Sequence, residues 1–142
     1  MFLDVAIGPP TPVTSQPEEL LLFLPVGYLF TVLVEVPVLL VGLSRALGLR
    51  ERFFAGFWLT ACTYPIVVLV LPIVFASSPR SHYLLVAETF APLAECVLFR
   101  LAFGKRLDAG AKLRSFVTIV VANVLSFLLG EVLGAFGWFG LV

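Results

Sequence analysis

The stretch Tyr83–Phe103, YLLVAETFAPLAECVLFRLAF, decides the fold of this chain. A helix rises about 1.5 Å per residue, so a stretch of this length and apolar composition can cross the hydrocarbon core of a bilayer. It also carries two carboxylates, Glu88 and Glu95, which are spaced by two helical turns and therefore lie on one face. Because a carboxylate at membrane depth is costly, it indicates a functional site by default. The stretch thus predicts a membrane helix whose polar face is turned towards other helices.

The composition of the whole chain places lipid, rather than water, around most of it. Of the 142 residues, 61% are hydrophobic and 13% are charged, and the mean hydropathy is +1.10. A soluble domain is about half apolar and about a quarter charged, and a chain this short cannot bury so much apolar surface in one aqueous core. The formal net charge is zero, so there is no global attraction to nucleic acid and no nucleic-acid partner is expected.

Four apolar segments predict an all-α, polytopic membrane protein, a four-transmembrane-helix up-down bundle. The links between the segments are short and leave no room for a soluble domain, and we find no convincing internal repeat. We treat residues 1–142 as a single membrane domain with an extracytoplasmic tail, residues 1–17. The four helices are expected at about residues 19–43, 53–75, 81–103 and 115–136.

The basic residues predict the orientation of the bundle, because cytoplasmic loops carry an excess of Lys and Arg. Of the nine basic residues, Arg80 alone lies at the end that also holds the chain termini. The other eight flank two turns, which we therefore place in the cytoplasm, with an N-out and C-out topology. The pattern is that of a multi-pass protein of a bacterial-type inner (plasma) membrane. The eight are Arg45, Arg50, Arg52, Arg100, Lys105, Arg106, Lys112 and Arg114.

Counting along each helix from its end places one polar side chain of every helix at a common depth. These side chains form the predicted inner cluster: Glu35, Thr60, Glu95 and Asn123. No Lys or Arg lies at this level, and two unpaired carboxylates cannot both remain ionised cheaply in a low-dielectric medium. Either the acids are neutral and hydrogen-bond the helices together, or they share a proton or hold a cation, or one of them meets a basic group of a partner subunit.

The same arithmetic predicts an outer polar layer near the opposite face of the membrane. Glu88 and Glu131 come out at one level, and Arg80 and His82 are close enough to that level to be their partners. The chain thus suggests two polar layers, an outer one with possible counter-charges and an inner one without them.

Small residues on the last helix predict a packing surface. Gly130 and Gly134 form a G-x-x-x-G motif, and such residues let helices approach closely in lipid. We therefore expect this stripe to face another helix.

No pattern in the sequence predicts a metal or a cofactor. The two cysteines, Cys62 and Cys96, lie inside apolar stretches and form no C-x-x-C, which disfavours thiol-shuttling chemistry. His and Cys are not spaced as metal ligands, and no histidine or nucleophile accompanies the carboxylates. We therefore expect no metal, no cofactor and no catalytic residue. Acid–base chemistry on a lipid-borne substrate is the enzymatic alternative that the carboxylate pair leaves open.

The chain resembles a recurring type of small bacterial four-helix integral membrane protein. The resemblance is carried by E-x-P in the first helix (Glu35–Pro37), TACTYP in the second (Thr60–Pro65), two Glu in the third, and A-N-x-x-S in the fourth (Ala122–Ser126). It covers the whole membrane part and implies the four-helix membrane class, without a mechanism.

Two functions are compatible with these patterns. The leading expectation, favoured by minimal loops and a stripe of small residues, is a non-enzymatic accessory or assembly subunit of a larger membrane complex. Its partners would be the lipid bilayer and either other membrane-protein subunits or further copies of the chain. The uncompensated inner cluster favours the alternative, a proton- or cation-coupled transporter or channel that uses Glu35, Glu95 and Asn123.

Overall fold

The computed structural model describes residues 17–136, and the side chains of residues 17, 19, 20, 134 and 135 lie outside that description. The described part is helical apart from short links, and no strand occurs in it, so the prediction of an all-α fold is confirmed. Residues 1–16 of the predicted tail lie outside the described part. The elements in order are α1 (Pro17–Gly42), α2 (Leu49–Pro65), the π-helical segment η1 (Ile66–Val70), α3 (Leu71–Val74), α4 (Arg80–Phe103), the 3-10 turn η2 (Gly104–Arg106) and α5 (Ala109–Ala135).

Three helical spans are long and apolar enough to cross a membrane: Leu21–Gly42, Leu49–Val74 and Ala109–Leu133. The second of them is made of α2, η1 and α3, which follow one another without a break. The fourth long helix, α4, has 24 residues and carries Glu88 and Glu95. Large apolar side chains are exposed on every span, and surfaces of this kind are stable in lipid rather than in water. The chain is therefore a membrane-embedded protein.

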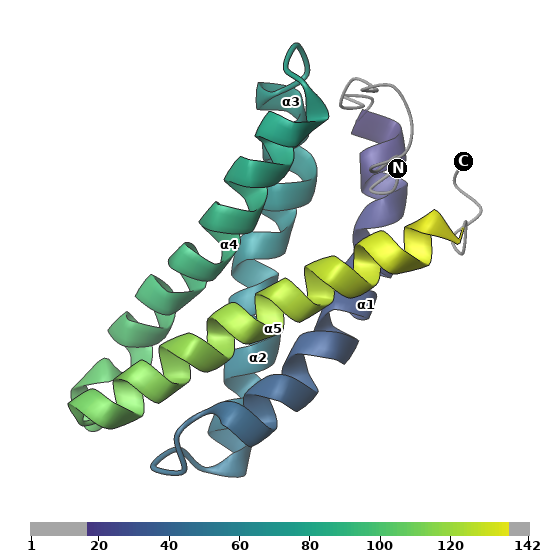
Figure 1. Ribbon diagram of the computed structural model, residues 1–142. Helices are drawn as coiled ribbons and strands as arrows, with labels where there is room; N and C mark the ends of the chain where they lie inside the picture. Colours follow the sequence, from purple (N-terminus) through teal and green to yellow (C-terminus); the bar gives the residue numbers. More distant parts are fainter. Residues whose placement is uncertain (1–16, 137–142) are drawn as a thin grey trace.

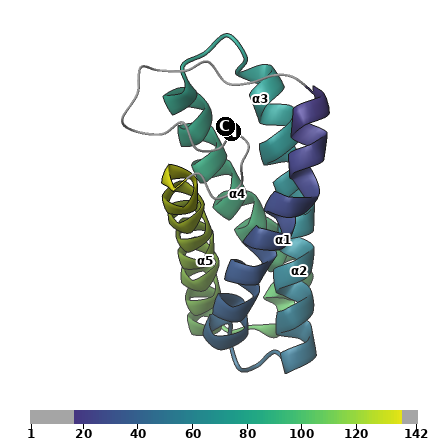
Figure 2. The same ribbon diagram turned by 90° about the vertical axis from the view of Figure 1, so that its right-hand side faces the viewer.

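The long helices run alternately up and down and pack as a ring (Figures 1 and 2). α1 packs against α2 and α5, and α4 packs against the same two helices. The α1–α2 and α4–α5 links lie together at one end of the bundle, which we call the basic end because Arg45, Lys105 and Arg106 lie in these links. The start of α1, the α3–α4 link and the end of α5 lie towards the opposite end (Figure 1).

Both links at the basic end are shorter than the sequence predicts, because the helix after each link begins earlier. α2 begins at Leu49 rather than residue 53, where the Glu51 carboxylate accepts a hydrogen bond from the N–H of Gly48 at 2.9 Å. α5 begins at Ala109 rather than residue 115, where the side chain of Asp108 accepts a hydrogen bond from an N–H of the first turn at 2.7 Å. In both cases a carboxylate accepts a hydrogen bond from a backbone N–H at the helix N-terminus, an arrangement that stabilises the start of a helix.

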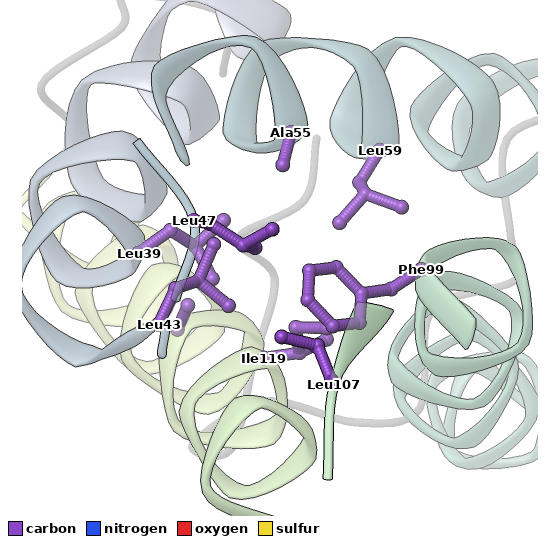
Figure 3. Close-up of a cluster of buried hydrophobic side chains, with 9 residues drawn as sticks. Leu39, Leu43, Leu47, Ala55, Leu59, Phe99, Leu107 and Ile119 are labelled. Carbon is purple, nitrogen blue, oxygen red and sulfur yellow. The ribbon is translucent and has the colours of Figure 1, made fainter. Parts of the chain in front are cut away.

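An apolar cluster drawn from all four long helices and both links closes the basic end; we call it the basic-end core. Its side chains point towards a common centre (Figure 3). Lipid supplies no hydrophobic driving force between helices, so close contacts of this kind hold the bundle together by dispersion. The members are Leu39, Leu43, Leu47, Ala55, Leu59, Phe99, Leu107, Ile119 and Ala122.

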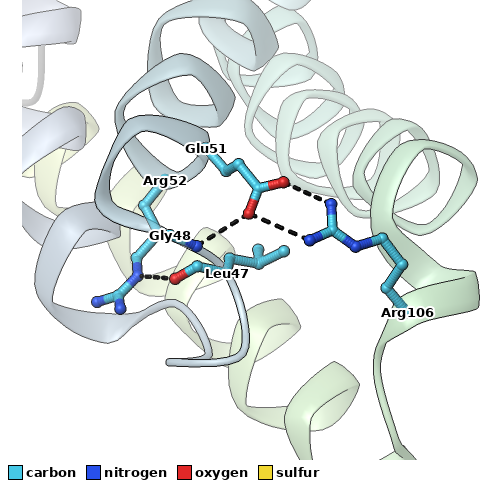
Figure 4. Close-up of polar contacts among 5 residues, drawn as sticks. All are labelled: Leu47, Gly48, Glu51, Arg52 and Arg106. Atoms are coloured by element: carbon cyan, nitrogen blue, oxygen red, sulfur yellow. Dashed lines mark hydrogen bonds and ion pairs between the residues drawn. The ribbon is translucent and has the colours of Figure 1, made fainter.

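An ion pair joins α2 to η2 at the surface of the basic end (Figure 4). Arg106 donates hydrogen bonds to both carboxylate oxygens of Glu51, and the longer of the two measures 3.4 Å. The hydrogen bonding and charge of this carboxylate raise the pKa of Arg106 above its ordinary value. Because Arg106 is exposed, the pair adds little to stability.

The π-helical segment of the second span follows from a proline. Pro72 has no N–H to donate. The N–H of Leu71 bonds to the carbonyl of Ile66, which is the π spacing, and the carbonyl of Val67 accepts a hydrogen bond from the Tyr83 hydroxyl at 3.2 Å. A side chain of α4 thus partners a backbone group that this irregular stretch leaves open.

Candidate functional site

Two carboxylates from non-adjacent helices of the ring are buried in the bundle interior. Glu35 of α1 is 2% exposed and Glu95 of α4 is 1% exposed. On each helix the carboxylate lies one turn from a member of the basic-end core, on the side away from the basic end. An unpartnered buried charge is very costly, so the hydrogen-bond donors around each carboxylate decide what the pair can do.

Glu35 accepts one hydrogen bond on each of its carboxylate oxygens. Thr60 Oγ1 donates to Oε2 at 2.7 Å, and Ser126 Oγ donates to Oε1 at 2.8 Å. These donors belong to α2 and α5, the two helices that flank α1 in the ring. One carboxylate therefore connects three helices.

Glu95 is held in the same manner by the same two helices. Thr63 Oγ1 of α2 donates to Oε1 at 2.8 Å, and Asn123 Nδ2 of α5 donates to Oε2 at 2.8 Å. On each donor helix the two donors are three residues apart, so they share a face and reach both carboxylates. The structure thus brings together the four predicted residues of the inner cluster, and adds Thr63 and Ser126 to them.

The hydroxyl groups of this shell can serve either protonation state of the carboxylates. Thr60 Oγ1 also lies 2.9 Å from the Gly56 carbonyl, and Thr63 Oγ1 lies 3.2 Å from the Leu59 carbonyl. A hydroxyl has one hydrogen to donate and two lone pairs to accept with. It can donate to an ionised carboxylate, or accept from a protonated one and turn its hydrogen to the backbone carbonyl. Only hydrogen positions change between the two arrangements.

Asn123 is different, because both of its amide hydrogens are used. Nδ2 donates to Glu95 Oε2 and also to the Ile119 carbonyl, at 3.0 Å. An amide nitrogen cannot accept a hydrogen bond in return. A proton on Glu95 therefore belongs on Oε1, the oxygen that faces Thr63.

Glu35 and Glu95 line one cavity of about 110 Å³ between the four long helices. Its wall is mostly apolar and carries the two carboxylates and their donors as polar groups, and a space of this size has room for several water molecules. Among the described residues that line it, none is Lys, Arg or His. The aromatic side chains in its wall are Phe23, Phe30, Tyr64 and Phe127.

The outer polar layer meets the same cavity. Glu88 and Glu131 both line it, and Arg80 pairs with Glu131 at 3.3 Å with both side chains largely buried. The second oxygen of that carboxylate, Oε2, is buried and accepts no hydrogen bond within the described residues. His82 has an exposed side chain and does not line the cavity. The structure therefore brings together three of the four residues predicted for this layer.

Of the two glycines predicted to pack against another helix, the structure describes the surroundings of Gly130 alone. Gly130 lies beside Phe30 of α1, and an added Cβ would sit 3.8 Å from that ring, an ordinary van der Waals distance. Gly134 is helical, and its surroundings lie outside the described part. The tightest approaches occur elsewhere: a Cβ at Gly27 would overlap Tyr64, and one at Gly42 would overlap Thr118.

Between residues 17 and 136, no three side chains of His, Cys, Asp or Glu are arranged to hold a metal ion. Comparison with protein-family models, curated proteins and solved structures gives no match. The function must therefore be inferred from the geometry of the site, and the resemblance to a small four-helix type remains a prediction.

Proposed function

We propose that the protein is a small integral membrane transporter or channel that is coupled to protons or cations through Glu35 and Glu95. The observation that carries the proposal is the shared cavity: two buried carboxylates, without a basic partner among its described lining residues, border a space with room for water. Carboxylates that merely connected helices would need their donors, but no cavity beside them. Intramembrane acids beside water are the typical groups of proton and ion pathways.

The hydrogen-bond shell supports this role. Three hydroxyl groups, on Thr60, Thr63 and Ser126, each have a carboxylate and a backbone carbonyl within reach. Proton uptake or release then needs rotation of hydroxyl groups and no movement of the helices. The other titratable groups that line the cavity are Tyr64, Glu88 and Glu131, and Arg80 pairs with the last of them.

We further infer that all four long helices span a bacterial-type inner membrane, with the basic end in the cytoplasm and both termini outside. The proposal is supported by the eight basic residues that flank the two links of that end. The basic-end core then separates the cavity from the cytoplasm, so passage to that side requires this core to open.

Flux across liposomes tests the transport proposal. The purified protein is reconstituted with a dye for H⁺, Na⁺ or K⁺ inside the vesicles, and a gradient of the matching ion is applied in either direction. Wild-type protein should accelerate the flux of one of these ions over protein-free vesicles. Glu35→Gln and Glu95→Gln should each lower that flux by about ten-fold or more, because the amide can neither bind nor release a proton.

Glu18→Gln is the matched control, because Glu18 is an exposed carboxylate of α1 outside the cavity. It should transport like the wild type. If wild-type vesicles match protein-free vesicles under every gradient, the transport proposal is wrong.

The second candidate is the accessory or assembly subunit. Exposed apolar side chains on all the long helices can be covered by a neighbouring polypeptide as well as by lipid. A partner that docks at the inner cluster would supply polar groups to the carboxylates. Here all four donors come from the chain itself, which favours the transporter.

A further inference from the structure

The first helices of the two halves of the chain, α1 and α4, bury corresponding positions when they are aligned on their inner carboxylates. The alignment sets each residue of α1 against the residue sixty positions later. Outward-facing positions agree as well, since Leu33 and Leu93 are both exposed. The buried pairs at this separation are Phe23 with Tyr83, Gly27 with Ala87, Glu35 with Glu95, and Leu39 with Phe99.

The links that follow these two helices contain equivalent backbone hydrogen bonds, again between residues sixty positions apart in the sequence. In the first link, the N–H of Leu47 donates to the carbonyl of Ser44 at 3.1 Å. In the second, the N–H of Leu107 donates to the carbonyl of Gly104 at 3.5 Å. Both leucines are buried in the basic-end core. The correspondence therefore continues through the turn at the basic end.

The second helices, α2 and α5, correspond at a separation of sixty-three positions. The three additional residues make nearly one helical turn, so the same face stays inward. Both members of each pair are buried or line the cavity. The pairs are Leu59 with Ala122, Thr60 with Asn123, Thr63 with Ser126, and Tyr64 with Phe127.

The hydrogen bonds of the site obey this correspondence. If each residue of the α1–α2 hairpin is replaced by its equivalent in the α4–α5 hairpin, and the reverse, each of the four hydrogen bonds to Glu35 and Glu95 becomes another of the four. The helix contacts behave alike, because the α1–α5 contact becomes the α4–α2 contact. The bonds are Thr60 to Glu35 and Asn123 to Glu95 within hairpins, and Ser126 to Glu35 and Thr63 to Glu95 between hairpins.

We propose that the chain consists of two copies of one helix hairpin, related by a pseudo-twofold axis along the bundle, and that Glu35 and Glu95 are equivalent halves of one site on that axis. The second part rests on the proposed function. Each carboxylate accepts one donor from its own hairpin and one from the other, so both present a similarly held negative charge to a ligand between them, although Asn123 confines a proton on Glu95 to Oε1. The site then takes one positive charge, a proton or a small monovalent cation, that both carboxylates share. The apolar correspondence continues past the outer layer, but its polar groups do not correspond, since the position equivalent to Glu88 is Tyr28.

An exchange of side chains in the basic-end core tests the repeat without reference to transport. Leu39 and Phe99 are fully buried and point towards the same centre from opposite helices (Figure 3). Leu39→Phe alone overfills the core and Phe99→Leu alone leaves a void, so each should lower the thermal unfolding midpoint in detergent by roughly 3 to 10 °C. The double variant L39F/F99L should return to within about 2 °C of the wild type, because each side chain enters the place of its equivalent.

The control is a second exchange of Leu and Phe that keeps the total side-chain volume of the core but uses two positions that are not equivalent. Leu43 is a member of the same core, but its equivalent is Phe103. L43F/F99L should therefore stay as unstable as its single variants combined. Equal recovery in the two double variants, or no recovery in L39F/F99L, would overturn the repeat.

Donor exchange extends the test to the site. Thr60→Asn and Asn123→Thr each introduce the residue of the equivalent position, and each keeps a donor for its carboxylate. Both should unfold within about 3 °C of the wild type, whereas Thr60→Val should not. If Thr60→Asn is as unstable as Thr60→Val, the two halves of the site are not equivalent.

The liposome assay tests the shared charge. Glu35→Gln and Glu95→Gln should lower the flux to the same level, and the double variant should lower it no further. A pH gradient and a sodium gradient at constant pH distinguish a proton from a metal cation. Residual fluxes that differ by more than about ten-fold between the single variants would overturn the shared site. If no variant or wild-type flux is seen while L39F/F99L recovers, the repeat stands, and the proposed function and the shared charge both fall.

Discussion

Thr60 is one of three residues whose hydroxyl stands between a buried carboxylate and a backbone carbonyl. Thr89 of α4 makes the same local bond, 2.7 Å from the Leu85 carbonyl, but it is exposed and donates to no carboxylate of residues 17–136. The two residues therefore differ in the contact that matters for the site. Replacing each by valine separates the contribution of the carboxylate contact from that of the local bond.

Thr60→Val should lower the free energy of unfolding by about 1–3 kcal/mol, because one oxygen of the buried Glu35 carboxylate loses its donor. Thr89→Val should change it by less than about 0.5 kcal/mol. Unfolding in mixed micelles with increasing dodecyl sulfate, followed by circular dichroism, measures both values. Equal losses in the two variants would contradict the role assigned to Thr60.

The sequence predicts part of this site and misses part of it, for one physical reason. Depth arithmetic selects Glu35, Glu95 and Asn123 because such groups are costly in lipid and demand partners, and it selects Thr60 only because this residue lies at their level. Thr63 and Ser126 carry no such cost, since a serine or threonine in a helix can satisfy itself on the preceding turn. Nothing in the sequence distinguishes these two donors from the many hydroxyls that have no further role.

At the C-terminal end of α1, backbone carbonyl groups accept hydrogen bonds from arginine side chains of α2 and α5. Arg114 of α5 donates to the Gly42 carbonyl at 2.8 Å, and Arg52 of α2 donates to the Leu40 carbonyl at 3.0 Å. The last carbonyls of a helix have no intrahelical donor, so these arginines act as caps. A Cβ at Gly42 would overlap Thr118, so the close approach of α5 to α1 requires glycine.

Gly42→Ala should therefore destabilise the protein by about 1–3 kcal/mol, because the methyl group forces the two helices apart. Adding Thr118→Ala removes the overlapping atoms and should restore at least half of the loss. Gly110→Ala is the control in α5, where the nearest atom to an added Cβ is Asp108 Oδ1 at 3.4 Å; it should stabilise by up to about 1 kcal/mol. The dodecyl sulfate titration again measures these changes, and strictly additive losses at Gly42 and Thr118 would refute the contact.

For the helices, the sequence predicts their positions along the chain better than it predicts where each one starts and which groups cap it. The apolar segments locate all four, but α5 begins at Ala109 because Asp108 caps it, a role that a polar turn does not reveal. The basic residues of the turns are read as topology signals, and two of them also cap a neighbouring helix. Capping between elements depends on which ends meet in space, and only the packed bundle supplies that.

The pseudo-twofold relation is a property of the whole molecule that the sequence conceals. Several corresponding positions are identical, among them Phe30 with Phe90 and Leu33 with Leu93. In a chain that is 61% hydrophobic, apolar identities of this kind arise by chance, and the shift between sixty and sixty-three positions breaks the register. Burial and hydrogen bonding reveal the relation because they record which face of each helix is turned inward.

The unequal charge of its two ends predicts how the whole molecule sits in the membrane. In a chain with Cys62 and Cys96 replaced by alanine, we place single cysteines at Ala46 and at Ser77, exposed residues in links at opposite ends of the bundle. A membrane-impermeant maleimide should label Ser77→Cys on bacterial spheroplasts, but Ala46→Cys only after they are permeabilised. The reason is the positive-inside bias, since eight of the nine basic residues flank the links of the Ala46 end. The opposite labelling pattern would invert the proposed topology. Labelling of both cysteines on sealed spheroplasts would show that the two ends do not lie on opposite sides.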